Sequence, residues 1–529
     1  MNGAQILIRT LVERGVDVSF MNPGTSEMHF VAALDEVPEM RAVLGLFEGV
    51  VAGAADGYGR VTGKPAATLL HLGPGLGNAV ANLHNARRAR TPVVNVVGEH
   101  ATYHLRYDPP LASDIESLAR PVSRWCRTTP SVEAVATDTA EAVAAALGPP
   151  GAVVTLVVPA DVSWSEPAEA AAAGAAVRAG SRSATAPAET TVSAEAVAEA
   201  VKALRSGEPT VILVGADATV RAGLLAASRV ATAAGARLVC ETFPARLERG
   251  AGLPAVERLG YLAEFTLAQL DGARHLILAG ATAPVSFFAY PGIPGYLVPE
   301  GCEVHVLCEP GHGSPAALEA VAEEMGAPAD GAAPAPSGRP ERPTGALTAE
   351  AAAAAIGALL PVGAIVSDEA NTAGIFIPGA TAGAPVHDWL CLTGGAIGQG
   401  MPVATGAAIG AGGRKVLSLE ADGSAMYTVQ ALWTQAREGL DVTTVIFNNG
   451  SYAVLEMELG RVGATAGGPR ARGMLEIGRP DLDFAALAEG MGVPASRART
   501  AEEFTTQLDE ALRSEGPVLV EAVLGRGAW

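Results

Sequence analysis

The sequence predicts an α/β protein made of three doubly wound domains with mainly parallel sheets. Continuous runs of Val, Ile and Leu, about five residues long, recur along the chain and are typical of strands buried on both faces. These runs alternate with helical patterns, which predicts parallel strands joined by right-handed crossovers. The length of 529 residues also exceeds the roughly 250–300 residues at which a single core stops growing.

Two segments divide the chain into blocks of domain size. Residues 165–190 are rich in small residues and have no periodic apolar face, and residues 325–346 are richer still in Pro, Gly and Ala. Such compositions bury too little apolar surface to order themselves strongly. We therefore expect domains at 1–165, 190–325 and 346–529.

Each block contains its own series of strands and helices. In the first block we expect strands at 18–20, 42–46, 66–70 and 92–97 and helices at 5–14, 25–34 and 49–62. In the second block we expect strands at 210–214, 237–240, 275–279 and 303–307, and in the third at 364–367, 415–419, 442–448 and 517–523. The first and third blocks could share one topology.

Composition and charge exclude several classes of partner. The net charge of −20 repels nucleic acids and anionic membranes, so neither is expected as a partner. The five cysteines lack metal-ligand spacing and are expected to be reduced and buried. The N-terminus lacks the features of a signal peptide, and no run of about 20 strongly apolar residues occurs. A cytoplasmic location is the resulting expectation.

Two polar loops follow neighbouring strands of the third block. Asp422 follows one strand and Asn449 follows the next, with an expected helix from about 426 to 438 between them. Because ligands bind at the carboxyl ends of parallel strands, we expect the two side chains to meet there. A carboxylate, an amide oxygen and a backbone carbonyl form a hard oxygen set that suits Mg²⁺, completed by diphosphate oxygens and water. Gly423 would let the backbone approach a phosphate.

This segment resembles the cofactor motif of the thiamine-diphosphate (ThDP) dependent decarboxylase family, in which GDG is followed about 25 residues later by NN. Here Ala421 replaces the first glycine of that motif. The resemblance implies that Asp422, Asn449 and the backbone carbonyl of Ser451 bind Mg²⁺. It also implies that Gly423 and Ser424 contact the cofactor diphosphate.

A second motif lies in the first block. Residues 46–66 resemble the family motif in which a glutamate at a strand end precedes a helix, followed by a sequence close to ADGYARATGKP. The resemblance places Glu48 where the family has the glutamate that protonates N1′ of the cofactor's aminopyrimidine. An apolar pocket that raises the carboxyl pKa would suit this role. Taken alone, Glu48 could equally be a solvated glutamate at a helix N-terminus.

Residues 393–402 and 73–78 complete the resemblance. The first segment resembles the loop that holds the aminopyrimidine, which implies that the Gly395 carbonyl binds the 4′-amino group and that Ile397 supports the bent cofactor. The second segment, GPGLGN, resembles a family segment that supports the site. The plain alternative for residues 393–402 is a turn that begins a helix.

Within the family the chain most resembles the benzoylformate decarboxylases and then the acetolactate synthase large subunits. His71 stands where the former have a catalytic histidine that orients the substrate carboxylate or transfers protons. Thr25 matches a substrate-binding serine. His71 could instead be a packed structural histidine, and Thr25 could instead cap the helix that follows it.

The chain also departs from these relatives. Phe287 or Phe288 falls where benzoylformate decarboxylases have a second catalytic histidine, and Glu458 falls where a substrate-facing aromatic residue is expected. The loop at 108–114 lacks the Phe-Gln pair of acetolactate synthases. The identity of the 2-oxo acid therefore does not follow from the sequence.

The resemblance implies a ThDP- and Mg²⁺-dependent 2-oxo acid decarboxylase, a carbon–carbon lyase. The alternatives are an acetolactate synthase-like carboligase and a non-catalytic binding protein with the same fold, which would be expected to lack Glu48 or Asp422. The family also implies a homodimer or homotetramer whose active sites lie at the subunit interface.

Overall fold

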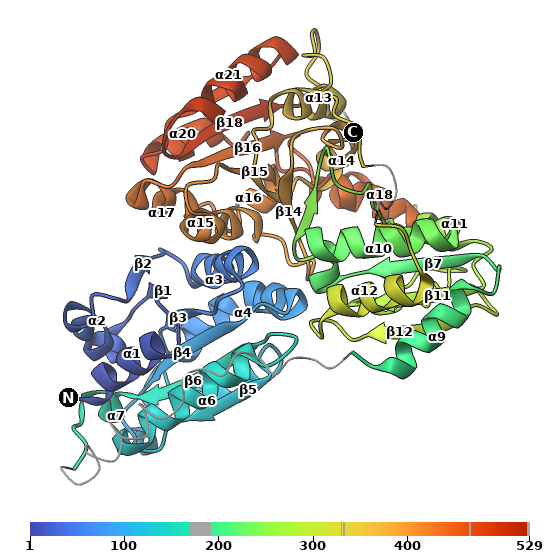
Figure 1. Cartoon of the computed structure of the whole chain (residues 1–529). Coiled ribbons are helices and arrows are strands. Elements are labelled where there is room, and N and C mark those ends of the chain that lie inside the picture. The colour runs from blue at the N-terminus through green and yellow to red at the C-terminus, as the bar shows by residue number, and fades with distance from the viewer. Residues whose placement is uncertain (169–191, 330, 332–333, 465–466, 526–529) are drawn as a thin grey trace.

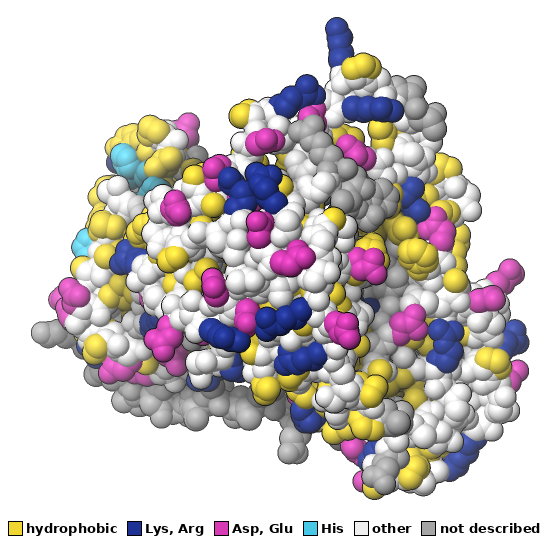
Figure 2. Space-filling view, turned by 90° about the horizontal axis from the view of Figure 1, so that it is seen from above, with side chains coloured by type: hydrophobic (Ala, Val, Ile, Leu, Met, Phe, Trp, Pro, Cys, Tyr) yellow, Lys and Arg dark blue, Asp and Glu magenta, His cyan; other side chains and the backbone are white. Residues whose placement is uncertain are grey.

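The computed structural model describes residues 1–168, 192–329, 331, 334–464 and 467–525. They form three mainly parallel sheets with helices on their faces (Figure 1). The expected α/β class is therefore confirmed. Within this part of the chain no helix is long and apolar enough to cross a membrane. On the face seen in Figure 2, acidic and basic side chains are interspersed.

The first sheet is fully parallel and has the strand order β2-β1-β3-β4-β6-β5. Its strands are β1 (Val18–Asn22), β2 (Arg41–Leu44), β3 (Ala66–Leu70), β4 (Val93–Glu99), β5 (Trp125–Thr128) and β6 (Val153–Pro159). The helices are α1 (Gly3–Glu13), α2 (Met28–Ala33), α3 (Glu48–Thr62), α4 (Leu72–Ala89), α5 (Ile115–Ala119), α6 (Val135–Leu147) and α7 (Ala160–Trp164).

The second sheet is also parallel and has the order β10-β8-β7-β11-β12. It contains β7 (Thr210–Val214), β8 (Arg237–Cys240), β10 (Glu257–Arg258), β11 (His275–Ala279) and β12 (Glu303–Cys308). Its helices are α9 (Ala194–Leu204), α10 (Arg221–Ala234), α11 (Ala263–Leu270) and α12 (Ser314–Met325).

The third sheet has the order β17-β18-β16-β15-β13-β14-β9. Its strands are β9 (Leu247–Arg249), β13 (Ile365–Glu369), β14 (His387–Cys391), β15 (Val416–Ala421), β16 (Val442–Asn448), β17 (Ala495–Ala498) and β18 (Val518–Val523). Its helices are α13 (Ala349–Leu359), α14 (Ile377–Ala380), α15 (Gly400–Gly410), α16 (Asp422–Ala425), α17 (Ala431–Glu438), α18 (Ala453–Arg461), α19 (Pro469–Gly473), α20 (Phe484–Gly490) and α21 (Ala501–Arg513).

The first and third sheets share one topology, as the sequence suggested. Counted along the chain, the six strands of each sheet lie in the order second, first, third, fourth, sixth, fifth. The third sheet differs in having β9 added beside its second strand, β14, in antiparallel orientation. Because β9 comes from the stretch of chain that also builds the second sheet, it joins the second and third sheets directly.

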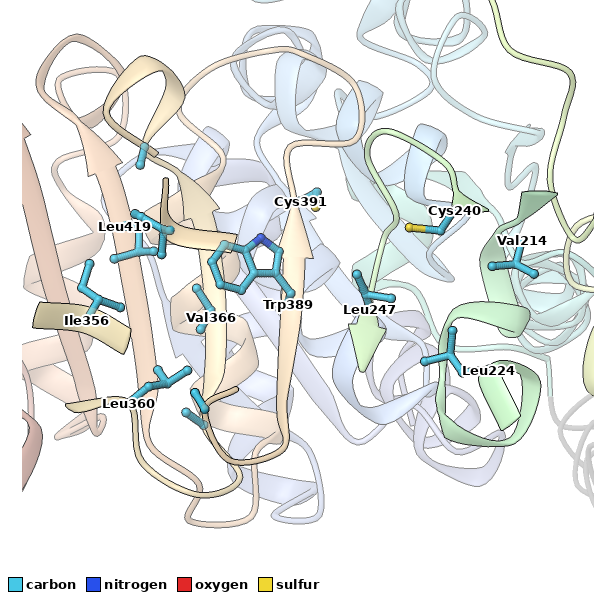
Figure 3. Close-up of a cluster of buried hydrophobic side chains, with 14 of the residues drawn as sticks. Val214, Leu224, Cys240, Leu247, Ile356, Leu360, Val366, Trp389, Cys391 and Leu419 are labelled. Carbon is cyan, nitrogen blue, oxygen red and sulfur yellow. The ribbon is translucent and has the colours of Figure 1, made fainter. Parts of the chain in front are cut away.

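A continuous core follows this junction. Val214 and Leu224 of the second sheet and its helices belong to the same buried cluster as Trp389 and Val366 of the third sheet, with Leu247 of β9 between them (Figure 3). Burial of side chains of this size stabilises the fold by about 1.5–3 kcal/mol each. The second and third sheets are therefore held together by packing as well as by strand pairing.

The strands agree with the sequence expectations more closely than the helices do. Every expected strand is present within two residues of its expected bounds, whereas β5, β6, β9, β10, β14 and β17 were missed. The expected helix at 25–34 is divided into α2 and flanking 3₁₀ turns (Thr25–Glu27 and Leu34–Glu36). The interdomain segment expected at 165–190 lies mostly outside the described residues, so the domain boundaries stay predictions.

The expected helix at 426–438 is wrong in its first half. Residues 422–425 form the short helix α16, two turns follow, and α17 begins only at Ala431. The hydroxyl of Thr428 donates to the carbonyl of Gly398, at 3.0 Å, and this tertiary bond ties the turn to another loop. Local periodicity gives no sign of such a bond.

Candidate active site

The loops after β15 and β16 meet at the carboxyl edge of the third sheet, as expected. Asp422 is 2% exposed. Its carboxylate accepts backbone N–H bonds from Gly423 (2.8 Å), Asn449 (3.0 Å) and Gly450 (2.7 Å). Burial raises the pKa of Asp422 to about 6, although these three N–H groups oppose the rise. The carboxylate is thus fixed between two strand ends, in a setting where a cation would stabilise its charge.

The neighbouring oxygens complete a set that fits Mg²⁺. The side-chain oxygen of Asn449 accepts the N–H of Ser451 at 3.0 Å, so the amide and the Ser451 backbone belong to one tight turn. Across the edge, Asn371 donates to the hydroxyl of Ser424 at 2.9 Å. The set contains a carboxylate, an amide and a backbone carbonyl and no sulfur, which is what a hard cation prefers.

Gly423 has a packing role that sequence reasoning did not foresee. A Cβ atom at this position would lie 2.4 Å from the ring of Tyr452. The glycine therefore lets Tyr452 pack against the start of α16, whatever ligand the loop binds. The short α16 also provides a weaker helix terminus than the long helix expected from the sequence.

Glu48 is the first residue of α3 and lies at the carboxyl edge of the first sheet. It is 8% exposed, and its carboxylate accepts a hydrogen bond of 3.0 Å from the side chain of Asn78. Asn78 belongs to the GPGLGN segment, which forms the first turns of α4. Val50 and Val51 are buried beside it, but Leu46 is half exposed. Glu48 is therefore a buried carboxylate and not the solvated helix-start residue that was the alternative.

His71 forms a pair that the sequence analysis missed. Its Nδ1 lies 2.8 Å from Oε2 of Glu27, and the same oxygen accepts the N–H of Gly24 at 2.7 Å. Burial raises the pKa of the Glu27 carboxyl, and the bonds from Gly24 and His71 partly oppose this. The sequence carried a signal for the bond from Gly24 to Glu27, because an acid three residues after a helix cap is typical of a capping box. It carried no such signal for the contact with His71.

The alternative role of Thr25 as a helix cap is wrong. Gly24 occupies the cap position, and its N–H is accepted by the side chain of Glu27, three residues on. Thr25 is exposed at the start of the 3₁₀ turn. Its hydroxyl is therefore left available to a ligand at this edge.

The loop between β14 and α15 carries Gly395 and Ile397. Gly395 has a φ of +74°, and a Cβ atom there would lie 2.5 Å from the ring of Phe287. Asn85 of α4 donates to the carbonyl of Ala396 at 2.7 Å. Ile397 is partly exposed. The loop is thus anchored by a helix of the first sheet and covered by an aromatic ring from the second.

Phe287 and Glu458 occupy different kinds of surroundings. The ring of Phe287 packs against Phe243, Tyr261 and Phe288, with centroid separations of 6.0, 5.3 and 4.9 Å. Glu458 accepts a hydrogen bond from Tyr290 (2.9 Å) and lies 3.7 Å from the guanidinium of Arg461. The ion pair compensates the charge of Glu458, while the aromatic group makes the space beside Gly395 apolar.

Two further buried acids, also missed by the sequence analysis, lie behind this loop. Glu369 of β13 accepts the N–H groups of Gly398 (2.7 Å) and Gly400 (2.5 Å), and it is paired in register with Glu420 of β15. Burial raises the pKa of Glu369 to about 7 and, together with repulsion from Glu369, raises that of Glu420 well above its usual value. The pair therefore retains a proton near neutrality and fixes the loop of Gly395.

The structure brings the expected residues together in two groups. One contains Asp422, Gly423, Ser424, Asn449 and Ser451. The other contains Glu48 and His71, which both border Gly75, together with Thr25, whose neighbour Gly24 borders the His71 ring. Among the described residues of one chain, no hydrogen bond joins Glu48 to Gly395 or to the Asp422 group.

Sequence models and known proteins agree with this arrangement. The family model "Thiamine pyrophosphate enzyme, N-terminal TPP binding domain" matches residues 1–118, and its C-terminal counterpart matches residues 382–522. The chain is 59% identical to the "Putative acetolactate synthase large subunit IlvX" of Mycobacterium tuberculosis, over 99% of both chains. It is 32% identical to the benzoylformate decarboxylase of Pseudomonas aeruginosa, over 97% of this chain and 96% of the relative.

A solved structure shows the same fold over the whole chain. The ThDP-dependent 4-hydroxybenzoylformate decarboxylase of Rhodococcus jostii RHA1 superposes with a TM-score of 0.85 at 26% identity, covering 99% of each chain.

Proposed function

This chain belongs to the thiamine pyrophosphate enzymes, in the decarboxylase and acetolactate synthase-like group, and we propose that it is a 2-oxo acid decarboxylase that uses ThDP and Mg²⁺. The observation that carries the proposal is the meeting of Asp422 and Asn449 at one sheet edge. There the Asp422 carboxylate accepts the backbone N–H of Asn449 at 3.0 Å. A buried glutamate, Glu48, stands at the equivalent edge of the first sheet. Together these two edges would supply the ion-binding and the acid–base groups that the proposed reaction needs.

The third sheet would hold the metal and the diphosphate. Asp422, the amide oxygen of Asn449 and the carbonyl of Ser451 are the proposed Mg²⁺ ligands. Gly423 and Ser424 would contact the diphosphate, with Asn371 fixing the Ser424 hydroxyl. Mg²⁺ would neutralise the Asp422 carboxylate, whose charge is otherwise disfavoured by burial.

Side chains at the carboxyl edge of the first sheet would transfer protons. When bound, ThDP supplies a nucleophilic carbon that adds to the 2-oxo carbonyl and accepts the electron pair that CO₂ leaves behind. Glu48 would exchange a proton with N1′ of the aminopyrimidine, and Asn78 holds its carboxylate in place for this. The Gly395 carbonyl would accept a hydrogen bond from the 4′-amino group, and Ile397 would support the cofactor from below.

The substrate would be held by the polar group at the ends of β1 and β3. His71, oriented by Glu27, and the exposed hydroxyl of Thr25 would bind the substrate carboxylate. The aromatic group around Phe287 favours an apolar substituent on the 2-oxo acid, because it would exclude water from that side. The benzoylformate decarboxylase relatives support this choice.

A carboligase is the second candidate. The relative that is 59% identical is named as an acetolactate synthase large subunit. A carboligase shares the decarboxylation step but consumes a second carbonyl compound, whereas a decarboxylase releases an aldehyde without one. Product analysis with and without an added 2-oxo acid or aldehyde distinguishes the two.

Among the described residues no hydrogen bond joins the Glu48 group to the Asp422 group, as expected if the two parts of one active site come from different chains. The hydrogen bond of Glu48 goes to Asn78 within its own half, and the Asp422 group is held by bonds within the third sheet. We propose a homodimer or homotetramer in which one chain supplies Glu48 and another supplies Asp422. A monomer in sedimentation that is fully active would contradict this.

The test is CO₂ release from a panel of 2-oxo acids with pyruvate, branched-chain and aryl members, in the presence of ThDP and Mg²⁺. Glu48→Gln is expected to lower the rate at least about tenfold, since it removes an acid–base group. Glu350→Gln, which changes an exposed glutamate in the first turn of α13, is the matched control and should retain full activity.

Each outcome has a clear meaning. Release of CO₂ that depends on Glu48 would establish the decarboxylating reaction and the substrate class. Equal rates for wild type and Glu48→Gln would refute the role of Glu48. No release from any acid by ThDP-loaded protein would refute the decarboxylase proposal.

A further inference from the structure

Ligand-type side chains also gather at the amino edge of the second sheet. His275 is the first residue of β11 and Glu303 is the first residue of β12, and the two are paired in register. His305 lies two residues further along β12, so its side chain emerges on the same face as that of Glu303. Glu208 precedes the neighbouring strand β7. The carboxyl edge of the same sheet lies on the opposite side, and from there the chain continues after β11 to Phe287.

The distances within this cluster match a metal site. Nδ1 of His275 lies 3.1 Å from Nε2 of His305 and 3.7 Å from Oε2 of Glu303, and the last two atoms are 3.9 Å apart. The nearest point equidistant from the three atoms lies in their plane, about 2.1 Å from each, which is close to the length of zinc–nitrogen and zinc–oxygen bonds.

The remaining nitrogen of His275 has the partner that a metal ligand needs. Nε2 of His275 lies 3.1 Å from Oε2 of Glu208, so an N–H there donates to a carboxylate. With a proton on Nε2, Nδ1 of His275 carries the lone pair and can bind a metal ion. Histidine ligands of zinc usually carry such an outer carboxylate.

The burial of the cluster also suits a metal site. His275 and His305 are only 10% and 17% exposed at their side chains. The imidazole of His305 also packs on that of His275, with ring centroids 5.2 Å apart. Glu303, in contrast, is 73% exposed, so an ion could reach the cluster from solvent. Helix α9 brings Glu199 and Lys202, which have opposite charges, near the same imidazole.

We propose that His275, His305 and Glu303 bind one Zn²⁺, with Glu208 orienting His275 and water in the fourth position. Two nitrogens and one carboxylate oxygen with an open position form a known type of zinc site. The ion would join β11 to the edge strand β12. Its site lies on the sheet edge opposite the proposed active site, so it is separate from the Mg²⁺ of the ThDP reaction.

The test uses the full-length chain without an affinity tag, saturated with ThDP and Mg²⁺ and freed of other metals. Zn²⁺ is titrated by calorimetry, and the bound metal is counted by mass spectrometry after gel filtration. One Zn²⁺ per chain is expected. Glu303→Gln and His305→Ala should weaken binding by more than tenfold, and Glu208→Gln by about 10–100-fold.

His312→Ala is the control, since His312 lies in the stretch of chain after β12 and outside the cluster. It should bind Zn²⁺ like the wild type. Glu303→Gln changes an exposed side chain and so tests the site even if His305→Ala folds poorly. Equal affinity of wild type and Glu303→Gln, or less than one Zn²⁺ per wild-type chain, would overturn the proposal and leave a hydrogen-bonded histidine pair.

Discussion

The first and third sheets share their strand order but carry different chemistry at equivalent positions. After the second strand, the first sheet has Glu48 and the third has Gly395. After the third strand, the first sheet has His71 and the third has Asp422. One topology is thus used twice, with titratable side chains at one edge and, at the other, loops whose backbone N–H groups hold the Asp422 carboxylate.

The partners of the acids explain this difference. Glu48 of the first half is bonded to the side chain of Asn78, and Glu27 is bonded to the side chain of His71 as well as to the N–H of Gly24. Asp422 of the third sheet is bonded to three backbone N–H groups. A side-chain partner can donate or release a proton, or change its own position. Backbone N–H groups instead hold a carboxylate in one position and favour its charged form. The comparison therefore predicts proton transfer at the first edge and ion binding at the third.

The largest effect is expected where the two halves touch. Helices α3 and α15, which follow the second strand in each sheet, pack directly on each other. A Cβ atom at Gly406 would lie 1.7 Å from the carbonyl oxygen of Ala54, and one at Gly57 would lie 2.0 Å from that of Val403. Gly406→Ala is expected to lower the free energy of unfolding by about 3 kcal/mol or more, because backbone atoms cannot yield to it. Urea unfolding measures this change.

Gly490→Ala is the matched control for this substitution. Gly490 is the last residue of α20, and a Cβ atom there would meet no atom within 4 Å. Alanine in a helix is favoured over glycine by up to about 1 kcal/mol, so this variant should be at least as stable as the wild type. Equal stability of Gly406→Ala and Gly490→Ala would show that the two helices are not in close contact.

A smaller effect is expected at the second strands themselves. In the first sheet β2 is an edge strand with exposed residues, whereas β14 of the third sheet is covered by β9 and fully buried. Burial lowers the pKa of His387, in β14, to about 4. Between these pH values His387 is protonated in the unfolded chain but not in the folded chain. The free energy of unfolding therefore falls as the pH drops through 6.5 towards 4.

His387→Phe should remove this part of the acid sensitivity. The fall in unfolding free energy between pH 7 and 4.5 is expected to be about 2 kcal/mol smaller in the variant than in the wild type. His312→Phe, at an exposed histidine, should show the wild-type fall. Parallel profiles for wild type and His387→Phe would mean that His387 binds its proton as readily in the folded chain as in the unfolded chain.

The sequence predicted those features that depend on local pattern and on topology. Strand ends are marked by apolar runs, so the approach of Asp422 to Asn449 followed from one strand–helix–strand unit. Glu369 was missed because its burial depends on Gly398 and Gly400, which are about 30 residues away in the chain. The pairing of β9 with β14 was missed because three residues carry little periodicity and the partner is distant in sequence.

The smallest effect is expected for the pair of Glu27 and His71 at the first edge. Glu27→Gln keeps the shape of the side chain but removes the charge to which His71 is bonded at 2.8 Å. If His71 binds the substrate carboxylate, kcat/KM should fall about tenfold, the cost of one lost charge-assisted hydrogen bond. Glu13→Gln, at an exposed position in the last turn of α1, should leave it unchanged. Unchanged kcat/KM in Glu27→Gln, with the unfolding free energy lowered, would make the pair a structural one and confine proton transfer at this edge to Glu48.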